Sequence, residues 1–175
     1  AVSKTVRANN ISRGLVKMIA YWSDEPIISL VLDSKLDTAI FAVPAGEGLS
    51  LDSTEPVTAC FSKWYKLHPL TMPTTAKACA YYLNGMLARK SAMERGYDIG
   101  ILRHTDGFVA EGSIESVFMV KDGILRTSPL GKILSSITRM SIIEAASAAG
   151  IEVSQALISQ EELVNADEIF TCHTG

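Results

Sequence analysis

Apolar residues alternate or recur at helical spacing through the first 45 positions of the chain. Residues 1–10 place apolar side chains on one side of a predicted helix that stops at two asparagines. Residues 15–22 and 38–43 carry β-branched and aromatic side chains, which are typical of strands. The pattern therefore predicts a small α/β domain over residues 1–45.

Turn-forming residues separate this region from the rest of the chain. Glycine, proline, serine and aspartate are concentrated in residues 46–56, where we predict an interdomain linker. A larger domain then runs over residues 57–175. It opens with a predicted strand at 57–65 and a predicted helix at 75–95, whose apolar residues recur at spacings of three and four. Gly96 is placed to end that helix.

Two Asp-Gly pairs each separate a pair of short apolar runs. Asp-Gly is a strong signal for a two-residue hairpin turn, since both positions tolerate a positive φ. Two successive hairpins predict an antiparallel sheet. The strands are expected at residues 99–103 and 108–110 around Asp106-Gly107, and at 116–121 and 124–127 around Asp122-Gly123.

The last forty residues alternate between predicted helices and strands. A helix is expected over residues 136–149, ending at Gly150, and a strand over 152–158. Ser159 and Glu162 have the spacing of a capping box at the start of a short helix. A final strand is expected at residues 168–172.

Composition excludes several classes of protein. The 175 residues are 47% hydrophobic and 20% charged, with a formal net charge of -3, which describes an ordinary globular protein. No run of lysine and arginine is present, so a nucleic-acid partner is not expected. The apolar stretches are far shorter than the roughly 20 residues that cross a bilayer, so no membrane partner is expected either.

Cysteine usage and the chain ends bear on compartment and completeness. Three widely spaced cysteines, Cys60, Cys79 and Cys172, fit neither a disulfide framework nor a zinc site. The simplest prediction is a reduced, cytoplasmic protein without a metal. The chain lacks an initiator methionine and stops shortly after the last predicted strand, which suggests an excised or incomplete chain.

Common catalytic motifs are absent from the sequence. Phosphate-loop, dinucleotide-binding, zinc-protease and nucleophile-elbow patterns do not occur. His68, His104 and His173 lie far apart, and each is expected to be a surface or structural residue.

Several segments, taken in order, resemble the fold-type IV pyridoxal-phosphate (PLP) enzymes: branched-chain aminotransferases, D-amino-acid aminotransferases and aminodeoxychorismate lyases. Each segment alone is weak evidence, but their shared order and spacing are specific. They are Pro73–Lys77 with Tyr81–Asn84, Asp106–Ser113, Val117–Gly123, Ile137–Arg139 and Ala166–Phe170. The resemblance implies an α+β fold: an incomplete small α/β domain, then a large cofactor-binding domain whose antiparallel sheet closes toward a barrel, with helices outside.

The resemblance assigns three residues to the reactive part of the cofactor. Lys77 matches the Schiff-base lysine, which binds the cofactor aldehyde and then moves the substrate α-proton. The predicted helix would place this lysine in its first turn, where the helix dipole disfavours a cation. Tyr82 matches the tyrosine that bonds the ring oxygen beside the Schiff base. Glu111 matches the carboxylate that keeps the pyridine nitrogen protonated, so that the ring accepts electrons.

The resemblance also assigns a phosphate seat to the start of the helix at 136–149. Backbone amides and the positive end of a helix dipole favour an anion at such a position. Ile137 and Thr138 match the family's phosphate-binding residues, and Thr174 matches a second threonine at the same phosphate. The alternative for this segment is a simple helix cap served by Ser135 or Ser136.

The sequence departs from the family mainly on the substrate side. Lys17 stands where branched-chain enzymes tend to have an arginine, and a lysine keeps the charge without the bidentate fork. The family's phosphate-binding arginine and its final strands have no counterpart in these residues. The other departures are Leu15 for a tyrosine, Ser116 for an asparagine, and Ser136 and His173 for glycines.

Three hypotheses for function follow from this comparison. The first is a PLP-dependent transaminase that moves an amino group between a small amino acid and a 2-oxo acid. Branched-chain amino acids are among the substrates that this hypothesis includes. The second is an aminodeoxychorismate lyase of the same fold, and the third is a truncated, non-catalytic scaffold. The resemblance also implies a homodimer, because the family builds its active site at a dimer interface.

Overall fold

A computed structural model describes residues 1–23, 35–45 and 55–173 of the chain. Its contacts divide the chain into two compact units, Ala1–Thr54 and Glu55–Thr174. The predicted linker at 46–56 falls almost entirely outside the described residues, so this boundary stays a prediction.

In residues 1–23 and 35–45, the first unit forms one helix and one pair of strands. Helix α1 spans Val2–Ala8, and strands β1 (Gly14–Trp22) and β2 (Leu36–Pro44) pair in antiparallel register. Lys17 lies opposite Phe41 in this ladder, and its side chain is exposed. The helix and both strands predicted for this region are therefore confirmed.

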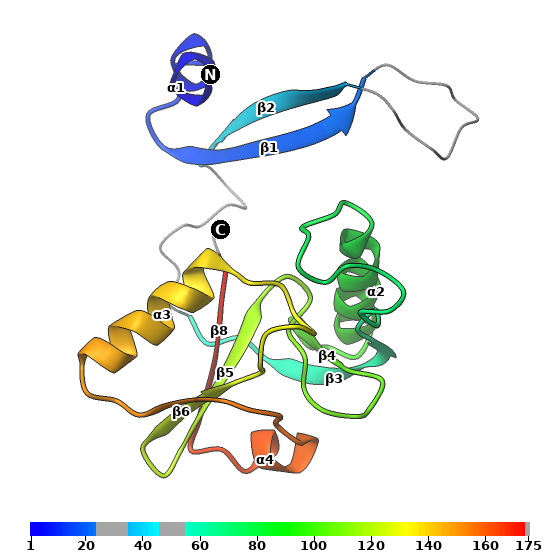
Figure 1. Ribbon diagram of the computed structural model, residues 1–175, viewed down its shortest axis with the longest axis vertical. Helices are drawn as coiled ribbons and strands as arrows, with labels where there is room; N and C mark the ends of the chain where they lie inside the picture. Colours follow the sequence, from blue (N-terminus) through cyan, green and yellow to red (C-terminus); the bar gives the residue numbers. More distant parts are fainter. Residues whose placement is uncertain (24–34, 46–54, 174–175) are drawn as a thin grey trace. The chain divides into compact units, whose positions relative to one another are not determined.

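Residues 55–173 of the second unit form two sheets and three helices, whose arrangement is shown in Figure 1. One sheet pairs β3 (Ala59–Tyr65) with β4 (Ile99–Arg103). The other has the order β7 (Val153–Gln155), β6 (Ile124–Thr127), β5 (Ser116–Lys121), β8 (Glu168–Cys172). The helices are α2 (Tyr81–Met93), α3 (Ile137–Ala148) and α4 (Gln160–Val164).

The prediction of one antiparallel sheet closing toward a barrel is wrong for the described residues. Strands β3 and β4 pair in parallel, as do β6 and β7, and the sheets do not close. The reason is the connection: α2 separates β3 from β4 and α3 separates β6 from β7, and a helical crossover returns the chain in a parallel direction. The α+β class itself is confirmed.

The two predicted hairpins have different outcomes. Asp122 and Gly123 adopt φ values of 51° and 78°, and they join β5 to β6 in an antiparallel pair as predicted. Around Asp106-Gly107 the chain does turn back, but residues 108–110 form a single bridge, Arg103 to Val109, in place of a strand. The pairing ends there because the Leu102 carbonyl accepts from the Ala110 amide at 2.9 Å, whereas the Leu102 amide donates to the Glu111 carbonyl at 2.8 Å, so two residues oppose one as in a β-bulge.

Helix α2 begins six residues later than predicted and ends where a glycine permits it. Turns precede Tyr81, and the Ala76 amide donates to the Pro73 carbonyl at 3.1 Å. At the other end Gly96 has a φ of 81°, and the Tyr97 amide reaches back to the Ala92 carbonyl at 3.1 Å. The positive φ and this hydrogen bond are those of a Schellman motif at the C-terminus of a helix, so the predicted role of Gly96 is confirmed.

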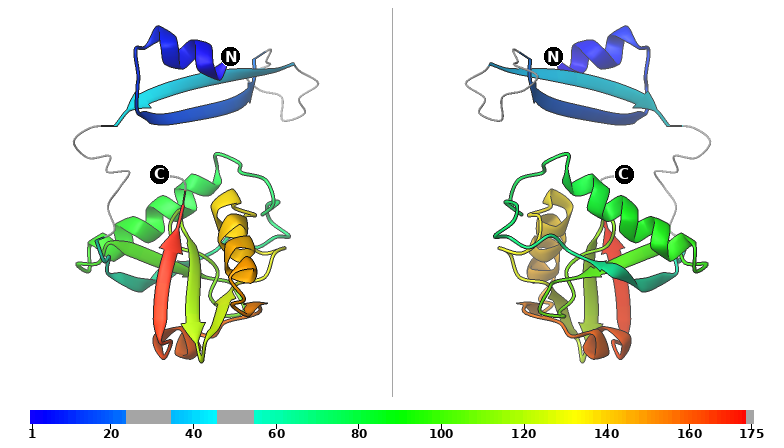
Figure 2. Two further views of the ribbon diagram at one scale, coloured as in Figure 1. Left: turned by 90° about the vertical axis from the view of Figure 1, so that its left-hand side faces the viewer. Right: turned by 90° about the vertical axis from the view of Figure 1, so that its right-hand side faces the viewer.

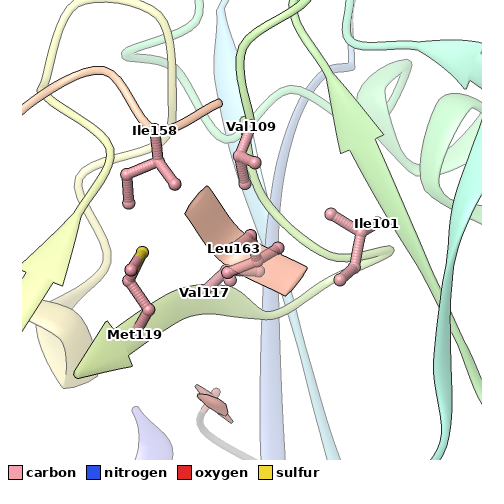
Figure 3. Close-up of a cluster of buried hydrophobic side chains, with 6 residues drawn as sticks. All are labelled: Ile101, Val109, Val117, Met119, Ile158 and Leu163. Carbon is pink, nitrogen blue, oxygen red and sulfur yellow. The ribbon is translucent and has the colours of Figure 1, made fainter. Parts of the chain in front are cut away.

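Strand β5 has both faces buried and organises the core. Val117 and Met119 point to one face, where they pack with Leu163 of α4 (Figure 3). Phe118 points to the other face, where α3 lies beside the four-stranded sheet and contributes Ala146 (Figure 2). Alternation of side chains along a strand explains the division. The six residues of the first cluster are Ile101, Val109, Val117, Met119, Ile158 and Leu163.

Arg139 ties the start of α3 to the loops around it. The side chain is 1% exposed, and its Nη2 donates to the Ser128 carbonyl at 2.8 Å and to Gln155 Oε1 at 2.9 Å. Burial lowers the pKa of this guanidinium, because the charged form loses water. Its hydrogen bonds to neutral oxygens hold the N-terminal turn of α3 in place.

Close backbone approach places α2 against the segment that carries Glu111. A Cβ at Gly85 would collide with the carbonyl oxygen of Ser113, and one at Gly100 would collide with that of Ala88. Both positions therefore require glycine. The consequence is that the start of α2, strand β4 and residues 111–116 lie together.

The remaining local predictions are largely confirmed. Ser159 and Glu162 form the expected capping box of α4, and the Ser159 hydrogen bonds help lower the pKa of Glu162 to about 2. Helix α3 is capped by Ser136, and β8 has the predicted bounds. Strand β7 is shorter than predicted, at three residues. No helix in the described ranges is long and apolar enough to cross a bilayer.

We predict a histidine-dependent loss of stability in mild acid. Burial lowers the pKa of His104 to about 4 from 6.5, so the unfolded chain binds a proton first as the pH falls through that window. The contribution of neutral His104 to stability is complete above its unfolded pKa of 6.5, and it is lost as the pH falls toward the folded pKa of about 4. The free energy of unfolding should fall by up to about 1.4 kcal/mol per pH unit, which urea titrations at several pH values measure.

His104→Leu removes the titrating group and should flatten this slope. Exposed His173 provides the matched control, since His173→Gln should leave the slope unchanged. Equal slopes in the parent chain and in His104→Leu would contradict the assignment.

Candidate active site

Glu111 is held at the end of a buried segment by its own backbone. Its carbonyl accepts from the Leu102 amide at 2.8 Å, which fixes it beside β4. The side chain is 16% exposed, with Oε1 2.5 Å from Lys66 Nζ. Oε2 lies 3.4 Å from the Leu134 amide, in the loop that leads into α3. The predicted acid and the start of α3 are therefore neighbours.

Tyr81 and Lys66 complete the surroundings of this carboxylate. Lys66 Nζ lies 4.7 Å from the centroid of the Tyr81 ring, and the Tyr81 hydroxyl donates to the Met72 carbonyl at 2.8 Å. Burial raises the pKa of Tyr81, and the negative charge of Glu111 raises it further. The charge of Glu111 thus acts at the first residue of α2.

Lys77 lies in the turns before α2 and not in a helix. Its predicted position in a first helical turn is wrong, because α2 begins at Tyr81. Lys77 therefore does not meet the unfavourable helix dipole that was predicted for it. The Lys77 side chain is exposed, with its Nζ 5.8 Å from the centroid of the Tyr82 ring. Tyr82 is 43% exposed, so these two predicted residues lie close together at the surface of this unit.

The segment that carries Lys77 is bonded to the loop that leads into α3. Thr74 is 5% exposed, and its hydroxyl donates to the Gly131 carbonyl at 2.9 Å. The same loop presents the Leu134 amide to Glu111. Hydrogen bonds therefore connect the Lys77 segment, Glu111 and the start of α3 through one loop.

Ser136, and not Ser135, is the residue that caps the start of α3. Its Oγ accepts from the Arg139 amide at 3.3 Å, whereas the Ser135 hydroxyl lies 3.3 Å from Met140 sulfur. Ile137 is 82% exposed and Thr138 is half-buried. First-turn amides have no acceptor within a helix, so a helix cap and an anion seat are compatible here.

Two predicted site residues stay predictions. Thr174 lies outside the described residues. Lys17 belongs to the other compact unit. Cys172, near the end of β8, faces Ser116 and Arg139, and burial raises the pKa of its thiol. The end of β8 therefore lies close to the first turn of α3.

Sequence reasoning missed Lys66, Tyr81, Thr74 and the Leu134 amide. None of these residues stands out in its local pattern, since Lys66 follows a strand and Thr74 follows a proline. A buried lysine is uncommon unless it is paired, but burial itself is a tertiary property. Lys66 and Glu111 are 45 positions apart in the sequence, and only the fold brings them together as a pair.

Histidines and cysteines have structural surroundings. His104 is 4% exposed, and His68 Nδ1 accepts from the Leu70 amide at 3.2 Å. All three cysteines are free thiols. Within the described ranges, no group of three or more histidine, cysteine or acidic side chains is arranged to hold a metal ion.

A comparison with known families identifies the chain. The family profile described as amino-transferase class IV matches residues 1–175. The chain belongs to the class IV aminotransferases. The resemblance expected from Lys77, Glu111 and their neighbouring segments is confirmed at the level of the family.

The curated relatives that the chain matches are longer than the chain. It is 34% identical over 178 residues to a branched-chain-amino-acid aminotransferase of Escherichia coli, covering 100% of this chain and 58% of the relative. It is 33% identical to a probable branched-chain-amino-acid aminotransferase of Aquifex aeolicus, over 91% of this chain and 51% of the relative. The chain thus spans a little over half the length of these relatives.

Solved structures confirm the fold of this class IV aminotransferase. A branched-chain aminotransferase from Thermoproteus uzoniensis, solved with norvaline, superposes with a TM-score of 0.91 at 38% identity, covering 98% of this chain and 57% of that one. A Thermobaculum terrenum branched-chain amino acid aminotransferase in its PLP form superposes at 0.87 and 34% identity, covering 95% and 55%.

We predict that Thr74→Val loosens the Lys77 segment. Valine has the shape of threonine without the hydroxyl, so the Gly131 carbonyl would lose its buried donor, at a cost of about 1–3 kcal/mol. Thermal unfolding should show the loss, and amide exchange of residues 75–80 should accelerate. Thr75→Val, at an exposed neighbour, is the control. Equal effects of the two variants would exclude a special role for the Thr74 hydrogen bond.

Proposed function

We propose that this chain forms the cofactor-binding part of a PLP-dependent transaminase that moves an amino group between a small amino acid and a 2-oxo acid. The observation that carries the proposal is the shared loop: Gly131 bonds the Lys77 segment, and Leu134 faces Glu111. An amine, a carboxylate and a helix N-terminus are thereby gathered in one unit. The relatives named as branched-chain aminotransferases support this class of substrate.

The donor set fits PLP chemically. The cofactor carries an aldehyde, a basic ring nitrogen and a phosphate, and when bound it supplies an electron sink for the substrate α-carbon. Lys77 offers an accessible amine, Glu111 a largely buried carboxylate, and the first turn of α3 an anion seat. Each chemical group of the cofactor thus has a matching residue type.

Lys77 is assigned to bind the aldehyde carbon and to carry the α-proton. Its exposure is consistent with this role, because the amine must be reached by cofactor and substrate. Tyr82, whose ring lies near the Lys77 ammonium, is assigned to donate a hydrogen bond from its hydroxyl to the ring oxygen. Glu111 is assigned to accept the ring N–H and keep that proton in place.

The phosphate is assigned to the first turn of α3. The Ile137 and Thr138 amides and the Thr138 hydroxyl would hold it, with Ser136 fixing the turn through its cap. Thr174 is assigned to the same phosphate from the residues after β8. Lys17 is assigned to the substrate carboxylate as a charged group without a bidentate fork.

A visible spectrum tests the assignment of Lys77. Purified protein mixed with PLP should develop the visible band of lysine-bound pyridoxal, and Lys77→Ala should abolish it. Lys90→Ala, which removes an exposed lysine of α2, should keep the band. A band that survives in Lys77→Ala would place the covalent link on another amine.

Single-turnover assays separate the three hypotheses. A transaminase should release one equivalent of 2-oxo acid when the loaded protein meets valine, leucine or isoleucine. A lyase would instead release pyruvate from aminodeoxychorismate. A scaffold would give neither product and no visible band in the parent chain.

We also infer a cytoplasmic homodimer. The free cysteines are consistent with a reducing compartment, and the family resemblance implies the dimer. Light scattering should report twice the monomer mass of 18.9 kDa. A single monomer mass at micromolar concentration would contradict the dimer.

A further inference from the structure

Lys66 is a buried cation that none of the roles above accounts for. Its side chain is 7% exposed, and it follows directly after β3. The backbone is held as well, since the Lys66 amide donates to the Arg103 carbonyl at 2.7 Å. A lysine seldom loses its water unless a partner replaces it.

Two groups hold the Lys66 ammonium. Glu111 Oε1 lies 2.5 Å from Nζ and forms an ion pair with it. The Tyr81 ring lies 4.7 Å away, a cation–π distance, and its hydroxyl is anchored on the Met72 carbonyl. Backbone, carboxylate and aromatic face together leave the ammonium little freedom.

Other titratable groups lie close to the pair, because the charge of Glu111 acts on Tyr81 and the charge of Lys66 acts on His104. His104 is neutral above pH 6.5, since its pKa is lowered to about 4. Lys132 is engaged by Asp106 in an ion pair of its own. The titratable groups that face the pair or His104 are Tyr81, His68, Asp106 and Lys132.

The ion pair fixes the orientation of the Glu111 carboxylate. Taking two charges out of water is costly, and contact between them offsets that cost, so the two groups stay together. The bond from Lys66 also engages Oε1 and leaves Oε2 on the side of the Leu134 amide.

We propose that Lys66 is a positioning residue of the cofactor site, which holds Oε1 of Glu111 so that Oε2 is left to accept the ring N–H. The inference rests on the proposed function for the cofactor, but the ion pair exists without it. Lys66 would also place a positive charge near the bound cofactor. That charge disfavours a further positive charge nearby, so it should lower the pKa of the protonated, lysine-bound pyridoxal that gives the visible band.

The protein without cofactor tests the ion pair. Lys66→Met leaves a buried carboxylate alone and should lower the melting temperature at pH 8 by about 10 °C. Lys66→Met combined with Glu111→Gln should be more stable than the sum of the two single effects predicts, since no lone charge remains.

Lys63→Met is the matched control for this stability series. It removes an exposed lysine from β3, three residues before Lys66, and should change the melting temperature little. Additive effects of Lys66→Met and Glu111→Gln would overturn the proposal.

The loaded protein tests the role toward the cofactor. In Lys66→Met the pH midpoint of the visible band should rise by about one unit. Lys66→Arg keeps the charge and should keep the midpoint, and so should Lys63→Met. A band with an unchanged midpoint in Lys66→Met would overturn the positioning role. Absence of any band in the parent chain would instead refute the proposed function, and the stability series would still judge the ion pair.

Discussion

The ion pair between Lys66 and Glu111 is the interaction on which the candidate site depends. A carboxylate that is only 16% exposed is costly to keep charged, and the ammonium 2.5 Å away offsets that cost. Burial of either residue alone would leave a charge without water or a partner, which is strongly destabilising. The pair joins the end of β3 to the segment after β4, and so it also holds the two parts of the unit that flank the start of α2.

Packing turns this pair into a defined site. Glycines at positions 85 and 100 let α2 approach β4 and residues 111–116, which places Tyr81 against the Lys66 ammonium. The loop around Gly131 then connects the Lys77 segment to the start of α3. Lys77 is exposed while Glu111 is largely buried, and this contrast suits their assigned roles: an amine that must be reached, and an anion that must stay in place.

Local features were predicted well because their causes act over a few residues. The Asp122-Gly123 turn, the capping box of α4 and the glycine stop after α2 each depend on neighbours within five positions. The start of α2 was predicted six residues too early, because Thr74 bonds a distant loop and residues 73–80 form turns. The strand at 108–110 was predicted but did not form, because Leu102 bonds both Ala110 and Glu111 and the pairing slips by one residue.

The sequence by itself determined the family, the residue types available to the candidate site and most of the order of the helices and strands. These are properties of residues and their spacing. Tertiary structure alone decided that β3 pairs in parallel with β4, that the sheets stay open, and that Lys66 meets Glu111 across 45 positions. Strand partners and buried charges depend on which surfaces lose water together, and that is settled only when the whole unit packs.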